Sequence, residues 1–156
     1  MTTIAWFDDL TVGMQFKSGE AQITAPEIKR FAAEFDPQPM HLDEDTATRS
    51  FFKGLAASGW HTAAIAMRLL VESRPFGDHP IIGLGGGLRW MAPVRPGDIL
   101  RLQGEVESLT PSKTKPQGTV GMKWTMYNQH GQAVYEFTPM TIVPRRPDTR
   151  DRSVEG

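Results

Sequence analysis

The start of the chain carries a strand pattern followed by a helix pattern. Residues 15–23 are predicted to form a short strand. Thr24 and Glu27 have the spacing of a capping box, and Pro26 suits a first helical turn. Apolar residues then recur three and four positions apart, at Ile28, Phe31, Ala32 and Phe35. This spacing predicts an amphipathic helix that buries one face.

Two prolines interrupt the helical pattern in the segment DPQPMH, residues 36–41. Because a proline disfavours helical geometry in the residue before it, Pro37 and Pro39 both act against a helix here. The first helix is therefore predicted to end near Phe35, and the segment to form a stiff, extended loop. A short helix is predicted next, over residues 42–52, because acidic side chains suit its first turn.

A longer helix is predicted from Gly59 to about Ser73, with Ser58 as its N-cap. Apolar and small residues occupy nearly every side of it, among them Trp60, Ala63, Ala64, Met67, Leu70 and Val71. A helix of this composition is expected to be buried at the centre of the molecule.

From residue 81 onward the hydrophobic period changes to two, which predicts antiparallel strands. The alternation is clearest at Leu100, Leu102 and Val106, and again at Val120, Met122, Trp124 and Met126. A last strand is predicted over residues 133–143, and Arg95-Pro-Gly-Asp98 has the composition of a tight turn. Three glycines at 85–87 suggest a strand that passes close to the central helix. The predicted class is α+β, with one sheet covering the central helix.

Composition excludes several classes of protein. The chain has 156 residues, enough for one domain, and a net charge of −1 does not favour nucleic acid or an anionic membrane as a partner. The absence of cysteine excludes disulfides, thiolate metal sites and a cysteine nucleophile. With no secretory signal and no apolar run long enough to span a bilayer, we expect a cytoplasmic protein. We expect one domain over residues 1–144 and a disordered, charged tail over 145–156.

Three segments carry a family resemblance: FAAEFDPQPMHLDEDTA, LAASGWHTAAIAMRLL and LRWMAPVRPGD. In this order they resemble the MaoC-like dehydratases, the (R)-specific enoyl-CoA hydratase group of the hotdog fold. The resemblance runs from about Thr24 to Val143. The usual loop pattern of that family is Gly-Asp-x-Asn-Pro-x-His, and here Phe35 and Gln38 replace the glycine and the asparagine.

The resemblance implies a hotdog fold, in which a curved antiparallel sheet wraps around the helix from Gly59 to about Ser73. It also implies pairing into a homodimer or higher homo-oligomer, with a substrate tunnel near the interface. The substrate would be an acyl-CoA thioester, and neither a further cofactor nor a metal is expected.

Hydration of an enoyl thioester needs a base, an acid and donors for the thioester oxygen. The resemblance places Asp36 and His41 over one water molecule, with Asp36 as the base. Without the resemblance, Asp36 could be a polar residue at a helix end. His41 could then be an exposed loop residue or the cap of the next helix. Which of the two delivers the proton is left open.

The resemblance also points to Gly59, whose backbone N–H at a helix N-terminus can stabilise an oxyanion. Both residues also have a non-catalytic explanation. Ser58 would only cap the helix, and Gly59 would only leave room for a neighbouring group to pack closely. Candidate substrate contacts are Gln38, Ser58, Trp60 and Arg89.

Other polar residues are weaker candidates for a functional role. A basic rim for the phosphates of CoA could include Arg89, Arg95, Lys113 and Lys115. His61 and His79 are interpreted as structural, and the acidic residues 43–45 beside His41 as a solvated helix turn rather than a metal site.

The sequence thus favours a hydratase or dehydratase of enoyl thioesters. The alternatives are a hotdog acyl-CoA thioesterase and a non-catalytic acyl-CoA-binding hotdog protein. Bulky Phe35, Trp60 and Trp90 are expected to shorten the tunnel, which favours short or branched acyl groups.

Overall fold

A computed structural model of the chain describes residues 5–148. It contains a 3-10 helix η1 (Phe7–Asp9) and strand β1 (Gln15–Gln22), followed by helices α1 (Ala25–Phe35), α2 (Pro39–Leu42), α3 (Glu44–Thr48) and α4 (Gly59–Ser73). Strands β2 (Ile82–Trp90), β3 (Ile99–Pro111), β4 (Gln117–Tyr127) and β5 (Ala133–Pro144) complete the chain. The order of the strands and of α1, α3 and α4 is the one that the sequence predicts, whereas η1 and α2 are not predicted.

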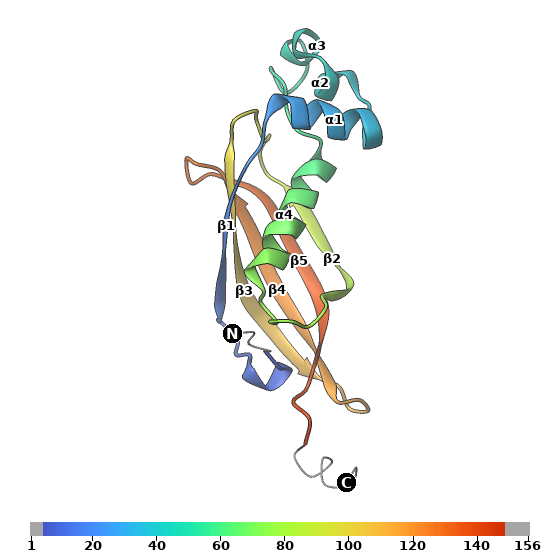
Figure 1. The fold of residues 1–156 in the computed structure, drawn as a ribbon, viewed down its shortest axis with the longest axis vertical. Coiled ribbons are helices and arrows are strands. Elements are labelled where there is room, and N and C mark those ends of the chain that lie inside the picture. The colour runs from blue at the N-terminus through green and yellow to red at the C-terminus, as the bar shows by residue number, and fades with distance from the viewer. Residues whose placement is uncertain (1–4, 149–156) are drawn as a thin grey trace.

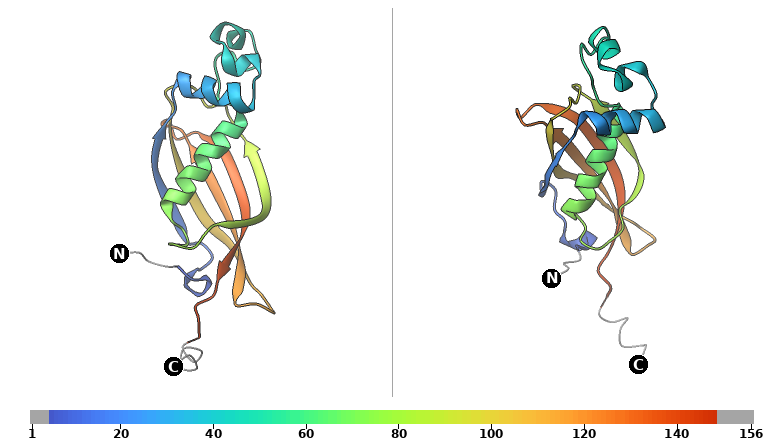
Figure 2. Two further views of the ribbon diagram at one scale, coloured as in Figure 1. Left: turned by 45° about the vertical axis from the view of Figure 1, so that its right-hand side comes forward. Right: turned by 45° about the horizontal axis from the view of Figure 1, so that its top comes forward.

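The five strands form one antiparallel sheet in the order β1-β3-β4-β5-β2. The sheet curves around α4, and α1 to α3 lie together beyond the end at which α4 begins (Figures 1 and 2). Residues at alternate positions of β3 and β4 are buried, as their spacing predicts, among them Leu100, Leu102, Met122 and Trp124. The hotdog architecture is therefore confirmed.

Helix α4 begins and ends where the sequence predicts, but only part of it is buried. Its buried residues are His61, Thr62, Ala66, Leu69 and Leu70. By contrast, Trp60, Met67 and Val71 are 58%, 40% and 51% exposed. The prediction that this helix is buried at the centre of the molecule is correct for one of its faces only, because the single sheet covers only that face.

The glycines at 85–87 have a different neighbour from the one predicted. A Cβ atom at Gly86 would lie 2.4 Å from the carbonyl oxygen of Thr138, and one at Gly87 would lie 3.0 Å from the Thr138 hydroxyl. Both contacts are with β5, which pairs with β2, and at Gly85 nothing lies within 4 Å. The predicted close approach to the central helix is therefore wrong.

The region between β1 and α4 agrees with the sequence except after Pro39. Thr24 caps α1 by accepting a hydrogen bond from the Glu27 amide, and α1 ends at Phe35. Residues 39–42 form the short helix α2 instead of an extended loop. Proline suits the first helical position because its fixed φ is helical and its missing N–H has no partner there. The predicted helix over 42–52 is shorter, since α3 covers only Glu44–Thr48.

The segment after β5 is described only as far as residue 148. Arg145 donates hydrogen bonds to the carboxylate of Asp8, and Arg146 pairs with Asp9. These ion pairs attach the end of β5 to η1. The rest of the predicted tail lies outside the described residues.

Candidate active site

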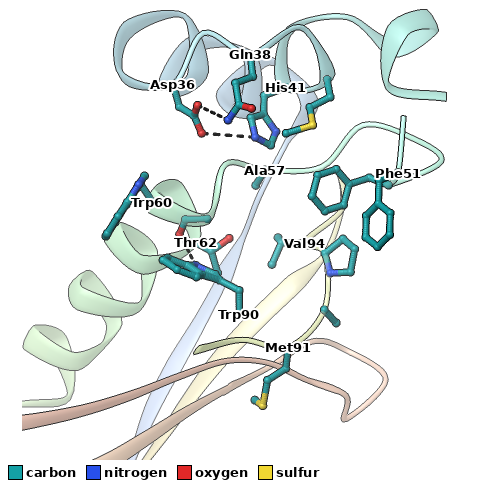
Figure 3. A pocket seen from close by; sticks show the side chains of 15 residues that line it. Asp36, Gln38, His41, Phe51, Ala57, Trp60, Thr62, Trp90, Met91 and Val94 are labelled. Atoms are coloured by element: carbon teal, nitrogen blue, oxygen red, sulfur yellow. Dashed lines mark hydrogen bonds and ion pairs between the residues drawn. The ribbon is translucent and has the colours of Figure 1, made fainter. Parts of the chain in front are cut away.

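The end of α1, helix α2 and the first turn of α4 surround a cavity of about 440 Å³. Asp36, Gln38 and His41 lie together on one side of it, and Trp60, Thr62 and Trp90 lie on the other (Figure 3). Apolar side chains form much of the remaining wall: Met40, Phe51, Phe52, Met91 and Val94. Phe35 is 65% exposed and does not line the cavity, so the prediction that it shortens the substrate tunnel is wrong.

Asp36 and His41 face each other at this cavity. Asp36 is the C-cap of α1 and His41 lies in α2, and 3.5 Å separates Asp36 Oδ2 from His41 Nε2. Their side chains are 18% and 4% exposed. The five-residue spacing seen in the sequence thus becomes direct proximity of a carboxylate and an imidazole that are largely withdrawn from bulk water.

The His41 ring is oriented by a backbone carbonyl. Its Nδ1 lies 2.7 Å from the carbonyl oxygen of Ala56, in the segment that leads to α4. Because a carbonyl oxygen can only accept, Nδ1 carries the proton and donates it. In the neutral ring Nε2 then carries a lone pair, and it faces the Asp36 carboxylate. Two acceptors in this position can both accept hydrogen bonds from one water molecule.

The Asp36 carboxylate has two side-chain donors. Burial raises the pKa of Asp36, but hydrogen bonds from Ser58 and Gln38, together with attraction to His41, outweigh burial and lower the pKa below its ordinary value. The Gln38 amide donates to Asp36 Oδ1 over 2.7 Å. Asp36 is therefore an ionised carboxylate at neutral pH and can accept a proton.

Ser58 has a role that sequence reasoning missed. Its hydroxyl oxygen accepts a hydrogen bond from the Trp60 amide at 3.2 Å, which confirms the predicted N-cap. The Ser58 side chain is fully buried, and its hydroxyl interacts with Asp36 and lowers the pKa of that carboxyl. Nothing in the local sequence links residue 58 to residue 36, because this contact arises only when α1 folds over the start of α4.

Gly59 is the first residue of α4, and the Trp90 indole packs so closely against it that there is no room for a side chain. The Trp90 indole Nε1 donates to the Gly59 carbonyl oxygen over 2.8 Å, and a Cβ at Gly59 would lie 2.8 Å from the indole ring. Within residues 5–148 the Gly59 N–H donates to no other group. An unpaired N–H at a helix N-terminus, beside a cavity, can bind a developing negative charge.

Comparison with known proteins now places the chain in a family. The family described as "MaoC like domain" matches residues 9–128. The chain belongs to this family. A MaoC-like dehydratase from Rhodospirillum rubrum has a solved structure that is 48% identical, with a TM-score of 0.89 over 92% of this chain and 99% of that one.

Two curated proteins also match over most of their lengths. The protein YdeM of Bacillus subtilis, described as uncharacterized, is 34% identical over 88% of this chain and 98% of its own length. A 3-hydroxybutyryl-CoA dehydratase of Methylorubrum extorquens is 30% identical over 72% of this chain and 70% of its own length. Family membership is thus supported along nearly the whole fold.

The predicted basic rim of this MaoC-like protein is not gathered at the cavity. Lys113 and Lys115 lie in the turn between β3 and β4, at the opposite end of the sheet from α1 to α3 (Figure 1). Arg89 is exposed on β2 and does not line the cavity. Arg95 points its guanidinium at the backbone carbonyls of Phe52, Gly54 and Leu55 instead of outward.

His61 and His79 lie outside the cavity wall. His61 is buried and stacks on Phe31 of α1, with ring centroids 4.6 Å apart, and burial lowers its pKa. His79 packs edge-on against Trp6. In the described part of the chain, no group of three or more His, Asp or Glu side chains is arranged to hold a metal ion. Nor does any helix between residues 5 and 148 have the length and apolar character to span a membrane.

Proposed function

We propose that the protein adds water to a short or branched trans-2-enoyl-CoA, or removes it from the corresponding 3-hydroxyacyl-CoA. One observation carries the proposal: Asp36 Oδ2 and His41 Nε2 lie 3.5 Å apart at a cavity that also contains the unpaired amide of Gly59. A water activator and an oxyanion donor at one cavity are the groups that this reaction needs.

In the hydration direction, a water molecule donates its two hydrogens to Asp36 and His41. Its oxygen lone pair is then directed into the cavity, toward the β-carbon of the enoyl group. As the C–O bond forms, Asp36 takes one proton from the water, and the Gly59 N–H stabilises the negative charge on the thioester oxygen. The pair then returns one proton to the α-carbon, so Asp36 and His41 end in their starting protonation states.

The substrate assignment is supported by the cavity and by a relative. Trp60 and Trp90 form one wall with their rings nearly perpendicular and 5.2 Å apart, which limits the space for a long acyl chain. The relative from Methylorubrum extorquens is a 3-hydroxybutyryl-CoA dehydratase, an enzyme of a four-carbon acyl group. Gln38, beside Asp36, and Trp60 are the proposed substrate contacts within the cavity. Arg89 precedes the cavity residue Trp90 on β2, outside the cavity lining, and is proposed to contact the CoA moiety.

The test is hydration of crotonyl-CoA by the purified protein, followed as loss of enoyl absorbance, with no metal or cofactor added. Asp36→Asn keeps the size of the side chain but cannot take the proton, so we expect the rate to fall about 10²–10⁴-fold. Asp45→Asn, an exposed carboxylate in α3, is the matched control and should retain full activity.

The same assay separates the competing functions. Release of free thiol from saturated and unsaturated acyl-CoA would indicate a thioesterase. Saturable binding of crotonyl-CoA without turnover would indicate a binding protein. Either result, or an Asp36→Asn variant as active as the natural chain, would overturn the proposal.

We also propose that two copies of the chain pair through β2 and the exposed face of α4. Strand β2 is at the edge of the sheet, and Ile82 and Leu84 on it are 50% and 61% exposed. Trp60, Met67 and Val71 of α4 add further exposed apolar surface. An unpaired strand edge beside apolar side chains is typical of a surface that another chain covers.

The cytoplasmic location expected from the sequence stays a prediction.

A further inference from the structure

Arg95 lies in a rigid turn between β2 and β3. The turn is closed by a hydrogen bond from the Asp98 amide to the Arg95 carbonyl at 3.1 Å, and the Asp98 carboxylate accepts from the Arg95 amide at 2.8 Å. Asp98 is buried and also accepts a hydrogen bond from the Gln129 side chain. The Arg95 side chain therefore begins from a backbone that is fixed on several sides.

The guanidinium of Arg95 holds the segment of residues 52–58, which we call the strap. It donates to the carbonyl oxygens of Gly54 at 2.9 Å and Leu55 at 3.2 Å, and also to that of Phe52. Next to it, the Val94 carbonyl accepts from the Ala57 amide at 2.9 Å. The planar fork of an arginine suits several carbonyls at once, which a lysine ammonium on a flexible chain does not.

The strap supplies a contact to each member of the Asp36–His41 pair. The carbonyl of Ala56 accepts from His41 Nδ1 at 2.7 Å, and the hydroxyl of Ser58 interacts with Asp36 and lowers the pKa of its carboxyl. Ala56 and Ser58 lie directly beyond the three carbonyls that Arg95 holds. The position of the strap thus decides which nitrogen of His41 is protonated and whether Asp36 keeps its second donor.

We propose that Arg95 is a positioning residue for the Asp36–His41 pair, acting through the strap, and not a ligand of the CoA phosphates. Its effect on catalysis rests on the proposed hydratase function, whereas its effect on the His41 ring can be measured without any turnover. Removal of the guanidinium releases three carbonyls, lets Ala56 and Ser58 move, and allows His41 to populate both neutral tautomers.

The experiment compares Arg95→Ala and Arg95→Lys with Arg101→Ala. Arg101 lies on β3, and its guanidinium lies over the ring of Tyr127 on β4. Steady-state rates are measured with crotonyl-CoA and with crotonyl-pantetheine, which lacks the nucleotide phosphates. In parallel, ¹⁵N NMR of the His41 ring, assigned with a His41→Asn variant, reports which nitrogen carries the proton.

We expect kcat of Arg95→Ala to fall about tenfold to a hundredfold with both thioesters, because small displacements of reacting groups are costly. Arg95→Lys should show a smaller loss, and Arg101→Ala none. The Nδ1–H form of His41 should give way to mixed tautomers in Arg95→Ala. A rise in KM confined to crotonyl-CoA, with kcat and the His41 tautomer unchanged, would overturn the proposal and make Arg95 a phosphate ligand.

Failure of the proposed function and failure of the variant to fold can each be distinguished from failure of the positioning role. If the natural chain hydrates no enoyl thioester, the proposed function fails, but an altered His41 tautomer in Arg95→Ala still supports the positioning role. If Arg95→Ala does not fold, Gly54→Ala perturbs the same contact, because a Cβ there would lie 3.3 Å from the guanidinium. An unchanged His41 tautomer in a folded Gly54→Ala that has lost the Arg95 contact would also overturn the proposal.

Discussion

At the scale of single residues, the charge on Asp36 is decided by two neighbours that donate to it. Burial alone would favour the protonated acid, yet the Ser58 hydroxyl and the Gln38 amide stabilise the carboxylate and lower its pKa. Gln38 replaces the asparagine of the usual family pattern but still reaches the carboxylate, at 2.7 Å. The glutamine at this position therefore supplies a hydrogen bond to Asp36.

Removal of either donor should move the acidic limb of the pH–rate profile. In Gln38→Ala or Ser58→Ala the pKa-lowering hydrogen bond is lost while burial remains, so the pKa of Asp36 rises. The carboxylate then becomes protonated at a higher pH, and the acidic limb of the kcat/KM profile moves to higher pH. At neutral pH we expect a loss of about tenfold or less, the equivalent of one hydrogen bond.

The measurement is kcat/KM for crotonyl-CoA from about pH 3.5 to pH 8, the range that brackets an ordinary carboxyl pKa. Thermal unfolding of each variant is the control for folding. An acidic limb that moves to lower pH, or does not move in either variant, would show that these donors do not set the protonation of Asp36.

At the scale of elements, the position of Asp36 depends on how α1 starts and on what it packs against. The Thr24 side chain caps α1, whose far end presents Asp36 to the cavity. Phe31 stacks on His61 with an angle of 7° between the rings, which joins α1 to the first turn of α4. The Asp36 carboxylate and the Gly59 amide thus lie at the ends of two helices that this contact joins.

Loss of the α1 cap should destabilise the chain moderately. Thr24→Ala removes the acceptor for the Glu27 amide, and we expect the free energy of unfolding to fall by about 1 kcal/mol. Urea denaturation followed by circular dichroism measures the change. The control is Thr114→Ala, an exposed threonine in the turn between β3 and β4. Equal stability of the two variants would contradict a capping role for Thr24.

At the scale of the whole molecule, the one-sided covering of α4 leaves apolar residues at the surface. The sheet buries Ala66 and Leu69, whereas Met67 and Val71 on the same helix remain exposed. Edge strand β2 adds Leu84, which is 61% exposed. The central helix is therefore only half covered within one chain, and the proposed second copy would cover the rest.

A charge in this surface should separate the copies. Leu84→Lys would place an ammonium group in an apolar interface without a partner, at a cost of several kcal/mol. We expect a dimer or larger assembly for the natural chain and a monomer for Leu84→Lys, measured by sedimentation velocity. Val12→Lys, an equally exposed apolar position in the turn before β1, is the matched control and should leave the assembly unchanged. A monomeric natural chain would contradict the proposed pairing.

The sequence alone determined most of the elements and their ends, and it singled out Asp36 and His41 as the candidate pair. Period-two alternation places Leu102 and Trp124 on the inner face of the sheet, because successive side chains in a strand point to opposite faces. Caps and prolines act within a few residues, so Thr24, Phe35 and Ser58 mark helix ends correctly. The family pattern added the expectation that Asp36 and His41 act together.

Only the tertiary structure decided which face of α4 is covered, and what surrounds the pair. An apolar pattern on nearly every side of a helix does not say which side the sheet will cover. The contacts of Ala56 with His41, Ser58 with Asp36, and Arg95 with the strap join segments 15 to 43 residues apart. Such contacts depend on how separate elements pack, which no local pattern of residues encodes.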